Sequence, residues 1–177
     1  MPLMDNLKPT ILVSACLLGE AVRYDGTHRR HDLLTKQFAI EFNLMPCCPE
    51  AGAGLGVPRP PVQLVAIDKK LHALGVEDSE LDVTAALQQF SKDFLYSAGP
   101  IHGAILKARS PSCGVDSTPM FNNAGDQLGV TNGLFADTVK RMFNALPVID
   151  ESKINNRQAC QVFKIAVEQY FKECCGL

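Results

Sequence analysis

Residues 9–16, with the sequence PTILVSAC, combine an apolar run with an ending of small residues. Such a run is typical of a parallel strand that is buried on both faces. Strand and helix patterns alternate from this run to the end of the chain, which favours a parallel sheet with helices on both sides. The sequence therefore predicts an α/β fold: one domain over residues 1–177, with a three-layer α/β/α architecture and a mainly parallel, Rossmann-like sheet.

The remaining elements follow from periodicity and from turn residues. Apolar runs bounded by Gly and Pro predict strands at residues 43–48, 62–68, 71–77, 101–110 and 147–151. The second and third of these strands are expected to pair as a hairpin. Apolar residues at helical spacing predict helices at residues 31–42, 78–99, 131–145 and 155–175. N-caps are expected at Asp32 and at Asp78 or Ser79, and an exposed turn or ribbon at residues 119–133.

The composition is that of a globular protein and argues against several other classes. Hydrophobic residues make up 46% of the 177 residues and charged residues 20%, as in ordinary globular domains. No apolar run approaches the roughly 18 residues of a membrane span, and Met1–Lys8 lacks the apolar core of a signal peptide. The net charge of −2 shows no basic excess of the kind that nucleic-acid binders carry. We therefore expect a cytoplasmic protein with no membrane attachment and no stable nucleic-acid complex.

The seven cysteines are many for a chain of this class, and their number is odd. Structural disulfides are rare in a reducing cytosol, and a complete set of disulfides would leave one thiol over. The count alone leaves three explanations open: buried inert thiols, a catalytic thiol, or a metal site.

Three segments of the chain are expected to bring cysteines to one edge of the sheet. Cys16 ends the first strand, and Cys47 and Cys48 end the second. Cys113 follows the strand predicted at residues 101–110. Parallel strands end at a common edge, which is where open α/β sheets bind ligands. Small residues, Gly and Pro around these cysteines let the backbone approach a bulky group and aim N–H donors at it.

Those surroundings suit an iron–sulfur cluster, whose sulfur ligands accept hydrogen bonds that help to set its reduction potential. Such clusters usually have four cysteine ligands, so three suitable segments indicate a cluster with one open iron. Zinc is a competing interpretation, although the chain has no C-x-x-C pair and no His beside these cysteines. The alternative is that Cys16 and Cys113 are small buried residues, a common role of free cysteine.

Geometry separates the two adjacent cysteines. Neighbouring residues on a strand point to opposite faces, so only one of Cys47 and Cys48 faces the edge. Pro49 holds Cys48 extended, and Cys48 lies nearer the carboxyl end of the strand. We therefore assign Cys48 as a ligand and Cys47 to packing within the sheet. The adjacent Cys174 and Cys175 are expected in a fraying, solvated tail.

Four motifs resemble those of a bacterial family that was long catalogued as a domain of unknown function and is typified by thiouracil desulfidase. They are VSACLLG with VRYDG, CPE with GLGVPRPP, LKARSPSCG, and GVTNGLFA, in the family's order between residues 11 and about 136. The cysteine directly before CPE departs from the family pattern. The resemblance is to a short form, because the larger members carry an extra C-terminal domain for which this chain is too short.

The resemblance implies a [4Fe-4S] cluster ligated by Cys16 in SACLLG, Cys48 in CPE and Cys113 in SPSCG. One iron lacks a protein ligand and takes the sulfur of a thiolated pyrimidine, 2-thiouracil or a relative, whose C=S becomes C=O with release of hydrosulfide. Glu50 matches the acid of CPE, and Ser110 matches the first serine of SPSCG. Both are expected as catalytic residues near the substrate.

A desulfidase needs a soft Lewis acid for sulfur, an activated water and stabilisation of the developing charge. Glu50 is expected to act as general base, since it shares one short loop with Cys48. The alternative for Glu50, which the residues alone favour, is a solvent-exposed loop carboxylate. Ser112, Asp25 and Arg59 are expected to contact the substrate, and turn-shaping or surface roles are the alternatives for each. The reaction expected is a hydrolytic, non-redox C–S cleavage of a small molecule.

Two alternative functions stay open at this level. A cysteine-nucleophile enzyme would use Cys113 or Cys48 with an adjacent base and without a cluster. A non-enzymatic iron–sulfur sensor or carrier would hold a cluster whose open iron binds no thiolated base. The sequence fixes neither the oligomeric state nor the form of the substrate, which is a 2-thio or 4-thio base, a nucleoside or a tRNA breakdown product.

Overall fold

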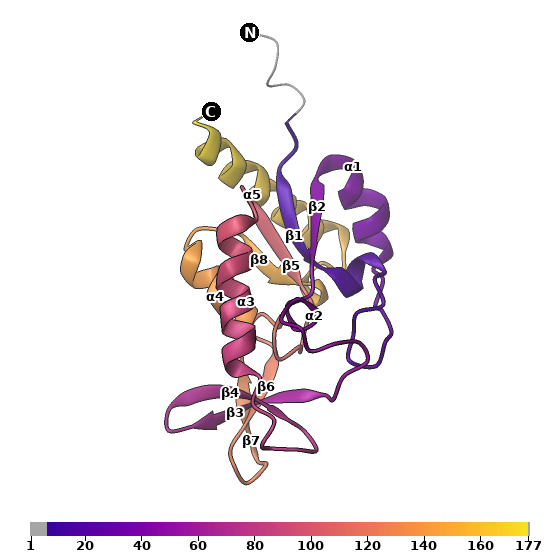
Figure 1. Ribbon diagram of the computed structural model, residues 1–177. Helices are drawn as coiled ribbons and strands as arrows, with labels where there is room; N and C mark the ends of the chain where they lie inside the picture. Colours follow the sequence, from indigo (N-terminus) through magenta and orange to yellow (C-terminus); the bar gives the residue numbers. More distant parts are fainter. Residues whose placement is uncertain (1–6, 177) are drawn as a thin grey trace.

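The computed structural model describes residues 7–176, and its main feature is a sheet of four parallel strands (Figure 1). This sheet, called sheet A, has the strand order β2-β1-β5-β8. β1 pairs in parallel with both β2 and β5, and β5 pairs in parallel with β8. The strands are β1 Thr10–Ser14, β2 Asn43–Cys47, β5 Gly103–Leu106 and β8 Val148–Asp150. The buried strand predicted at residues 9–16 is therefore an inner strand of the main sheet.

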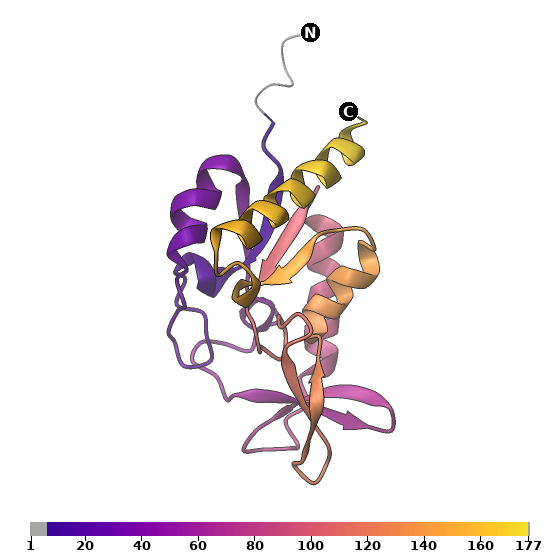
Figure 2. The same cartoon turned by 180° about the vertical axis from the view of Figure 1, so that it is seen from behind.

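Helices cover both faces of sheet A, which confirms the predicted three-layer α/β/α arrangement (Figures 1 and 2). Alternate residues of β1 divide between the faces, because successive side chains of a strand point in opposite directions. Ile11 and Val13 join an apolar cluster with Phe163 of α5, whereas Leu12 joins a cluster with Phe135 of α4. The helices are the π-helical turn η2 Leu34–Phe38, α1 Ala39–Glu41, α3 Thr84–Ser97, α4 Leu134–Met142 and α5 Arg157–Cys175.

A second sheet, called sheet B, lies beyond the carboxyl ends of the strands of sheet A (Figure 1). Its order is β4-β3-β6-β7, with two antiparallel hairpins joined by a parallel pairing of β3 and β6. The hairpin and the ribbon predicted from the sequence are confirmed, and their assembly into a separate sheet is a finding of the structure. The strands are β3 Val62–Ile67, β4 Lys70–Gly75, β6 Thr118–Phe121 and β7 Gln127–Thr131.

Two predicted helix caps are wrong. α3 begins at Thr84 rather than near Asp78 or Ser79, and the carboxylate of Asp82 accepts a hydrogen bond from the Thr84 N–H at 2.9 Å. Asp32 lies inside the first helical turn of its segment, where it pairs with Lys36 at 2.7 Å. Local side-chain pairs of this kind compete with capping for the same short polar side chains.

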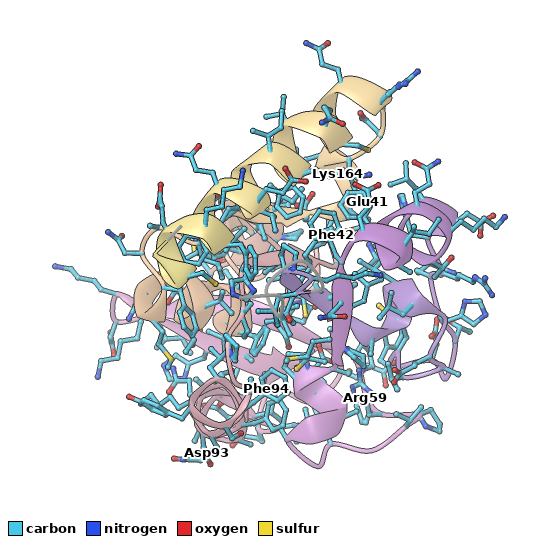
Figure 3. All side chains as sticks on the ribbon, turned by 90° about the horizontal axis from the view of Figure 1, so that it is seen from above. Glu41, Phe42, Arg59, Asp93, Phe94 and Lys164 are labelled. Carbon is cyan, nitrogen blue, oxygen red and sulfur yellow. The ribbon has the colours of Figure 1, made fainter. Side chains whose placement is uncertain are left out.

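Helix α5, near the end of the chain, contacts helix α1, which precedes β2. Lys164 of α5 forms an ion pair with Glu41 of α1, and both lie on the same side of the molecule (Figure 3).

Among residues 7–176, no helix has the length and apolarity that crossing a membrane requires. Residues 1–6, on which the expectation about a signal peptide mainly rests, lie outside the described residues.

Candidate active site

A cavity of about 400 Å³ lies at the carboxyl edge of sheet A, where β1, β2 and β5 end. Four thiols border it, those of Cys16, Cys47, Cys48 and Cys113. This edge faces the short helix α2 (Pro49–Gly52) and lies on the side of sheet A that faces sheet B (Figure 1). The structure thus brings the three predicted ligand segments to one cavity.

Cys16 is held by a short 3-10 turn, η1 (Ala15–Leu18), that follows β1 directly. The turn ends at Gly19, whose φ of 101° is a conformation that glycine adopts without strain. The carbonyl oxygen of Cys16 accepts a hydrogen bond from the N–H of Arg29 at 2.9 Å. The backbone of Cys16 is therefore held at its carbonyl group, and its side chain is buried.

Cys48 is the N-cap residue of α2, and its backbone is extended (φ −121°, ψ 103°), as predicted for the residue before Pro49. Its Sγ donates to the carbonyl oxygen of Val22 at 3.6 Å. Cys47 belongs to the apolar cluster that contains Leu12, and so does Cys113. Because Cys47 also borders the cavity, the choice of Cys48 as the ligand stays a prediction.

Cys113 lies in a turn that is held from two sides. The hydroxyl oxygen of Ser110 accepts hydrogen bonds from the N–H groups of Ser112 at 3.2 Å and Cys113 at 3.1 Å. On the other side, the N–H of Phe135 at the start of α4 donates to the carbonyl oxygen of Ser112 at 2.9 Å. A Cβ atom on Gly133 would lie 2.4 Å from the carbonyl carbon of Ser112. The motif GVTNGLFA therefore docks α4 onto the turn that presents Cys113.

Burial raises the pKa of all three predicted ligand thiols. The pKa of Cys16 rises to about 11, mainly through burial and further through the neighbouring Cys48. Burial also raises the pKa of Cys113 well above its ordinary value. For Cys48 the pKa rises through burial, although backbone N–H groups of α2 and the charge of Arg59 oppose the rise. Such thiols are protonated at neutral pH and lose their protons when a metal binds.

Positive charge gathers around the thiols. Five basic side chains border the cavity: Arg23, Arg29, Arg59, Lys107 and Arg109. Cations close to a thiol favour its thiolate form, and the charges of Lys107 and Arg23 both act in this direction on the pKa of Cys16. Three of the five pair with carboxylates, and the positive charge that remains suits an anionic group bound by thiolates.

Three further residues at this edge, Ser14, Lys107 and Glu151, are not predicted from the sequence as site residues. The ammonium group of Lys107 pairs with the carboxylate of Glu151, in the 3-10 turn η3 (Glu151–Lys153) that follows β8. The hydroxyl oxygen of Ser14 accepts a hydrogen bond from the N–H of Lys107 at 2.8 Å and lines the cavity. All three stand at or just after the carboxyl ends of parallel strands, and this position is the signal that points to them.

Glu50 lies in the first turn of α2 and borders the cavity with its side chain 11% exposed. Its Oε1 accepts a hydrogen bond from the hydroxyl of Ser112 at 2.9 Å, and its Oε2 accepts one from Nε of Arg59 at 2.8 Å. The alternative of a solvent-exposed loop carboxylate is therefore wrong. A buried carboxylate requires such partners, because its desolvation is otherwise costly.

The remaining predicted site residues differ in their positions. Ser110 and Arg59 border the cavity, and Arg59 lies beside α2 (Figure 3). Ser112 lies outside the lining and reaches the site through Glu50. Asp25 is also outside the lining, and the hydroxyl of Thr27, its partner at 2.6 Å, is the largest cause of its lowered pKa.

The donor set of the cavity fits an iron–sulfur cluster. Within residues 7–176, no three His, Cys, Asp or Glu side chains lie close enough together to bind one metal ion. A cluster bonds each cysteine to a different iron, so its ligands stand farther apart than those of a single ion. Within the described part of the chain, the lining supplies four thiols and no imidazole. Sulfur donors in a cationic pocket are the surroundings that such clusters use.

Known proteins are similar to this chain in sequence and in fold. A family model described as 2-thiouracil desulfurase matches residues 11–151. The uncharacterized protein YbbK of Bacillus subtilis (strain 168) is 30% identical over 158 residues, which cover 82% of this chain and 98% of YbbK. Among solved structures, the [4Fe-4S]-dependent thiouracil desulfidase TudS matches with a TM-score of 0.69 and 29% identity, over 89% of this chain and 99% of TudS.

Proposed function

Because the chain belongs to the 2-thiouracil desulfurase family, we propose that it is a desulfidase that converts the C=S group of a thiolated pyrimidine to C=O. The cofactor proposed is a [4Fe-4S] cluster held by Cys16, Cys48 and Cys113, with one iron left without a protein ligand. The [4Fe-4S] dependence printed for the structural relative TudS supports this assignment. The reaction is hydrolytic, so the sulfur leaves as hydrosulfide and no electron acceptor is needed.

The observation that carries the proposal is the convergence of three thiols from three chain segments on one cavity, beside a buried carboxylate. When bound, the cluster supplies a soft Lewis acid for the thione sulfur. The cavity of about 400 Å³ is within the range of small-molecule sites. A pyrimidine base is small enough to share such a cavity with a cofactor.

Glu50 is proposed as the general base that acts on water. In this role a carboxylate oxygen of Glu50 takes a proton from water while the water oxygen forms the new bond to the pyrimidine carbon. The hydroxyl proton of this adduct passes to the sulfur as the C–S bond breaks and the C=O bond forms, so the sulfur leaves as hydrosulfide. The proton held by Glu50 is then released to solvent. Each oxygen of Glu50 has one hydrogen-bond partner in the protein, and a carboxylate oxygen retains a second lone pair for water.

Ser110 is proposed to orient the substrate. Its hydroxyl oxygen already accepts two backbone N–H groups at the Cys113 turn, which leaves its O–H as the group able to donate to a ring carbonyl or nitrogen. Arg59 and Asp25 stay predictions as substrate contacts. The guanidinium group of Arg59 is engaged with Glu50 and with the carbonyl oxygens of Val22 and Gly56.

The proposal is tested with protein purified without oxygen. Iron, acid-labile sulfide and visible absorption report the cluster, and incubation with 2-thiouracil, 4-thiouracil and 4-thiouridine is followed by assays for hydrosulfide and for the oxo product. We expect equal amounts of the two products from at least one substrate, and a loss of about 10²- to 10⁴-fold in kcat for Glu50→Gln. A cluster-bearing protein that releases no hydrosulfide from any of them would indicate a sensor or carrier instead.

A cysteine-nucleophile enzyme is disfavoured by the raised pKa values of the three thiols, since the thiolate is the nucleophilic form. That alternative predicts a colourless protein whose hydrosulfide release is independent of iron and is abolished by thiol alkylation. Alkylation of the colourless, iron-free protein followed by the same substrate assay distinguishes the two functions.

A further inference from the structure

The carboxylate of Glu50 is held at both oxygens, by a residue of the loop that follows α2 and by a residue from a distant part of the chain. Arg59 reaches Oε2 through a single nitrogen, Nε, at 2.8 Å. Ser112 reaches Oε1 through its hydroxyl at 2.9 Å, across 62 positions of sequence. One contact to one oxygen leaves a carboxylate free to turn about its terminal torsion, which is broad and weakly restricted. The two contacts together fix the plane of the Glu50 carboxylate.

Both partners of Glu50 are themselves immobilised. Nη1 of Arg59 donates to the carbonyl oxygens of Val22 and Gly56, each at 3.0 Å, and the Arg59 side chain is only 4% exposed. The backbone of Ser112 is held by Ser110 on one side and by α4 on the other. Neither partner therefore follows Glu50 if the carboxylate moves.

We propose that Ser112 is a positioning residue, whose hydroxyl aims the Glu50 carboxylate into the cavity while Arg59 holds its other oxygen. This inference rests on the proposed function, in which Glu50 acts as general base. It replaces the substrate contact expected for Ser112 from the sequence, because Ser112 lies outside the cavity lining. It assigns to the second serine of SPSCG a role distinct from that of Ser110.

The contact also joins two of the three ligand segments. Glu50 follows Cys48 by two positions, and Ser112 directly precedes Cys113. The hydrogen bond between Glu50 and Ser112 therefore sets the base relative to both cysteines. Small errors in the position of a catalytic group lower the reaction rate strongly: a shift of about 1 Å can lower it about 10²-fold.

The first test compares Ser112→Ala, Ser112→Thr and the control Ser91→Ala. Ser91 is also fully buried, and its hydroxyl donates to the Leu87 carbonyl within α3 at 2.6 Å, so the control removes a buried hydroxyl away from the site. We expect Ser112→Ala to retain its iron content and its KM within about twofold and to lose about 10- to 100-fold in kcat. Ser112→Thr, which keeps the hydroxyl, is expected to recover most of the loss, and Ser91→Ala to keep the wild-type kcat.

A double-mutant cycle with Glu50→Gln separates positioning from a structural effect. If Ser112 acts through Glu50, Ser112→Ala lowers kcat little further once Glu50 is already Gln. Additive losses, an unchanged kcat in Ser112→Ala, or a loss confined to KM would each overturn the inference. A loss confined to KM would restore the substrate contact.

A crystal structure of Ser112→Ala gives a readout that does not depend on activity. We expect the Glu50 carboxylate to leave its wild-type orientation in the variant while Arg59 keeps its contacts with Val22 and Gly56. An unmoved Glu50 carboxylate would contradict the positioning role of Ser112. Failure of the proposed function shows differently, as wild-type protein that bears its cluster and releases no hydrosulfide.

Discussion

The carboxyl edge of sheet A and helix α5 both carry cysteines, but the two regions treat them differently. At the edge, Cys16, Cys48 and Cys113 come from three separate turns and border one cavity together with Cys47. On α5, Cys160 is buried and its Sγ donates to the carbonyl oxygen of Ile154 at 3.6 Å, and the two terminal cysteines are exposed. At the edge of sheet A the thiols lie around one cavity, whereas on α5 they lie at separate positions along one helix.

This difference teaches that the turn around a cysteine indicates its function better than the cysteine itself. The edge cysteines lie in turns rich in small residues, Gly and Pro, which leave room for a bulky group and aim backbone N–H groups. Cys174 and Cys175 are adjacent in a regular helix, whose N–H groups are already bonded within the helix. Variants in the two regions therefore separate a cofactor site from ordinary packing.

The largest effect is expected from replacing an edge cysteine. Cys16→Ser or Cys113→Ser should lose most of the iron and visible absorption and at least about 100-fold in hydrosulfide release, because loss of even an outer contact of a metal site costs about 10- to 100-fold. The matched control on α5 is Cys175→Ser, which should keep iron content and rate. Full iron content in an edge variant would remove that cysteine from the ligand set, and iron content measured per chain decides the case.

The next test replaces one glycine in each of the two regions with alanine. In Gly133→Ala the new methyl group would lie 2.4 Å from the Ser112 backbone, so α4 or the Cys113 turn must shift, with a cost of about 1–3 kcal/mol in unfolding free energy. In Gly176→Ala, at the end of α5, no other described residue beyond the chain neighbours comes within 4 Å of the new methyl group, and the cost of about 1 kcal/mol comes from the φ of 68°. Denaturant unfolding and iron content are measured for both variants, and only Gly133→Ala should lose iron. Equal iron content in the two would show that the docking of α4 does not position Cys113.

Much of the fold follows from local patterns. The parts that local patterns do not predict are determined by contacts between distant segments of the chain. The alternation of apolar runs and helical spacing predicts β1, β2 and β8 close to their observed bounds, whereas the strand predicted at residues 101–110 is confirmed only over Gly103–Leu106. The separation of sheet B rests on the parallel pairing of β3 with β6, which are more than 50 residues apart, and no local pattern encodes such a partner. The start of α3 at Thr84 reflects a hydrogen bond from the Thr84 N–H to the Asp82 carboxylate, which outweighs the earlier cap signals.

The candidate site also has one part that the sequence predicts and another that it does not. The convergence of Cys16, Cys48 and Cys113 follows from the rule that parallel strands end at one edge, and the motif resemblance points to Glu50. The hydrogen bond between Ser112 and Glu50 spans 62 positions and depends on the exact course of two turns. The close approach of Gly133 to Ser112 is equally invisible in the sequence, where Gly133 looks like part of an ordinary turn before a helix.

A smaller effect is expected where a thiol only packs. Cys160→Ala removes a buried sulfur from the cluster formed with Phe163 and Val167 and should cost about 1 kcal/mol in unfolding free energy, with iron content and hydrosulfide release unchanged. The exposed Cys174 is the control, and Cys174→Ala should change the unfolding free energy by less than about 0.5 kcal/mol. Iron loss in Cys160→Ala would contradict the separation of α5 from the cofactor site.

The smallest effect concerns pH and the packing of α5 against the amino end of sheet A. The Nδ1 atom of His102 accepts the Thr10 N–H at 2.9 Å, and the ring meets Phe171 of α5 edge-on at 4.8 Å between centroids. Burial lowers the pKa of His102 below its ordinary value of 6.5, so the unfolded chain binds this proton more readily than the folded protein. The stability that the neutral ring contributes is therefore complete above pH 6.5 and is lost as pH falls below it.

The matched variant is His102→Asn, whose side-chain oxygen can still accept from Thr10 but does not titrate. Between pH 7.5 and pH 5.5, the unfolding free energy should fall more for the wild type than for the variant, because only the wild type loses the stability of the neutral ring. An equal fall in both proteins would show that His102 does not titrate differently on folding. A smaller fall in the wild type would reverse the sign, and would mean that α5 and sheet A stabilise a protonated ring.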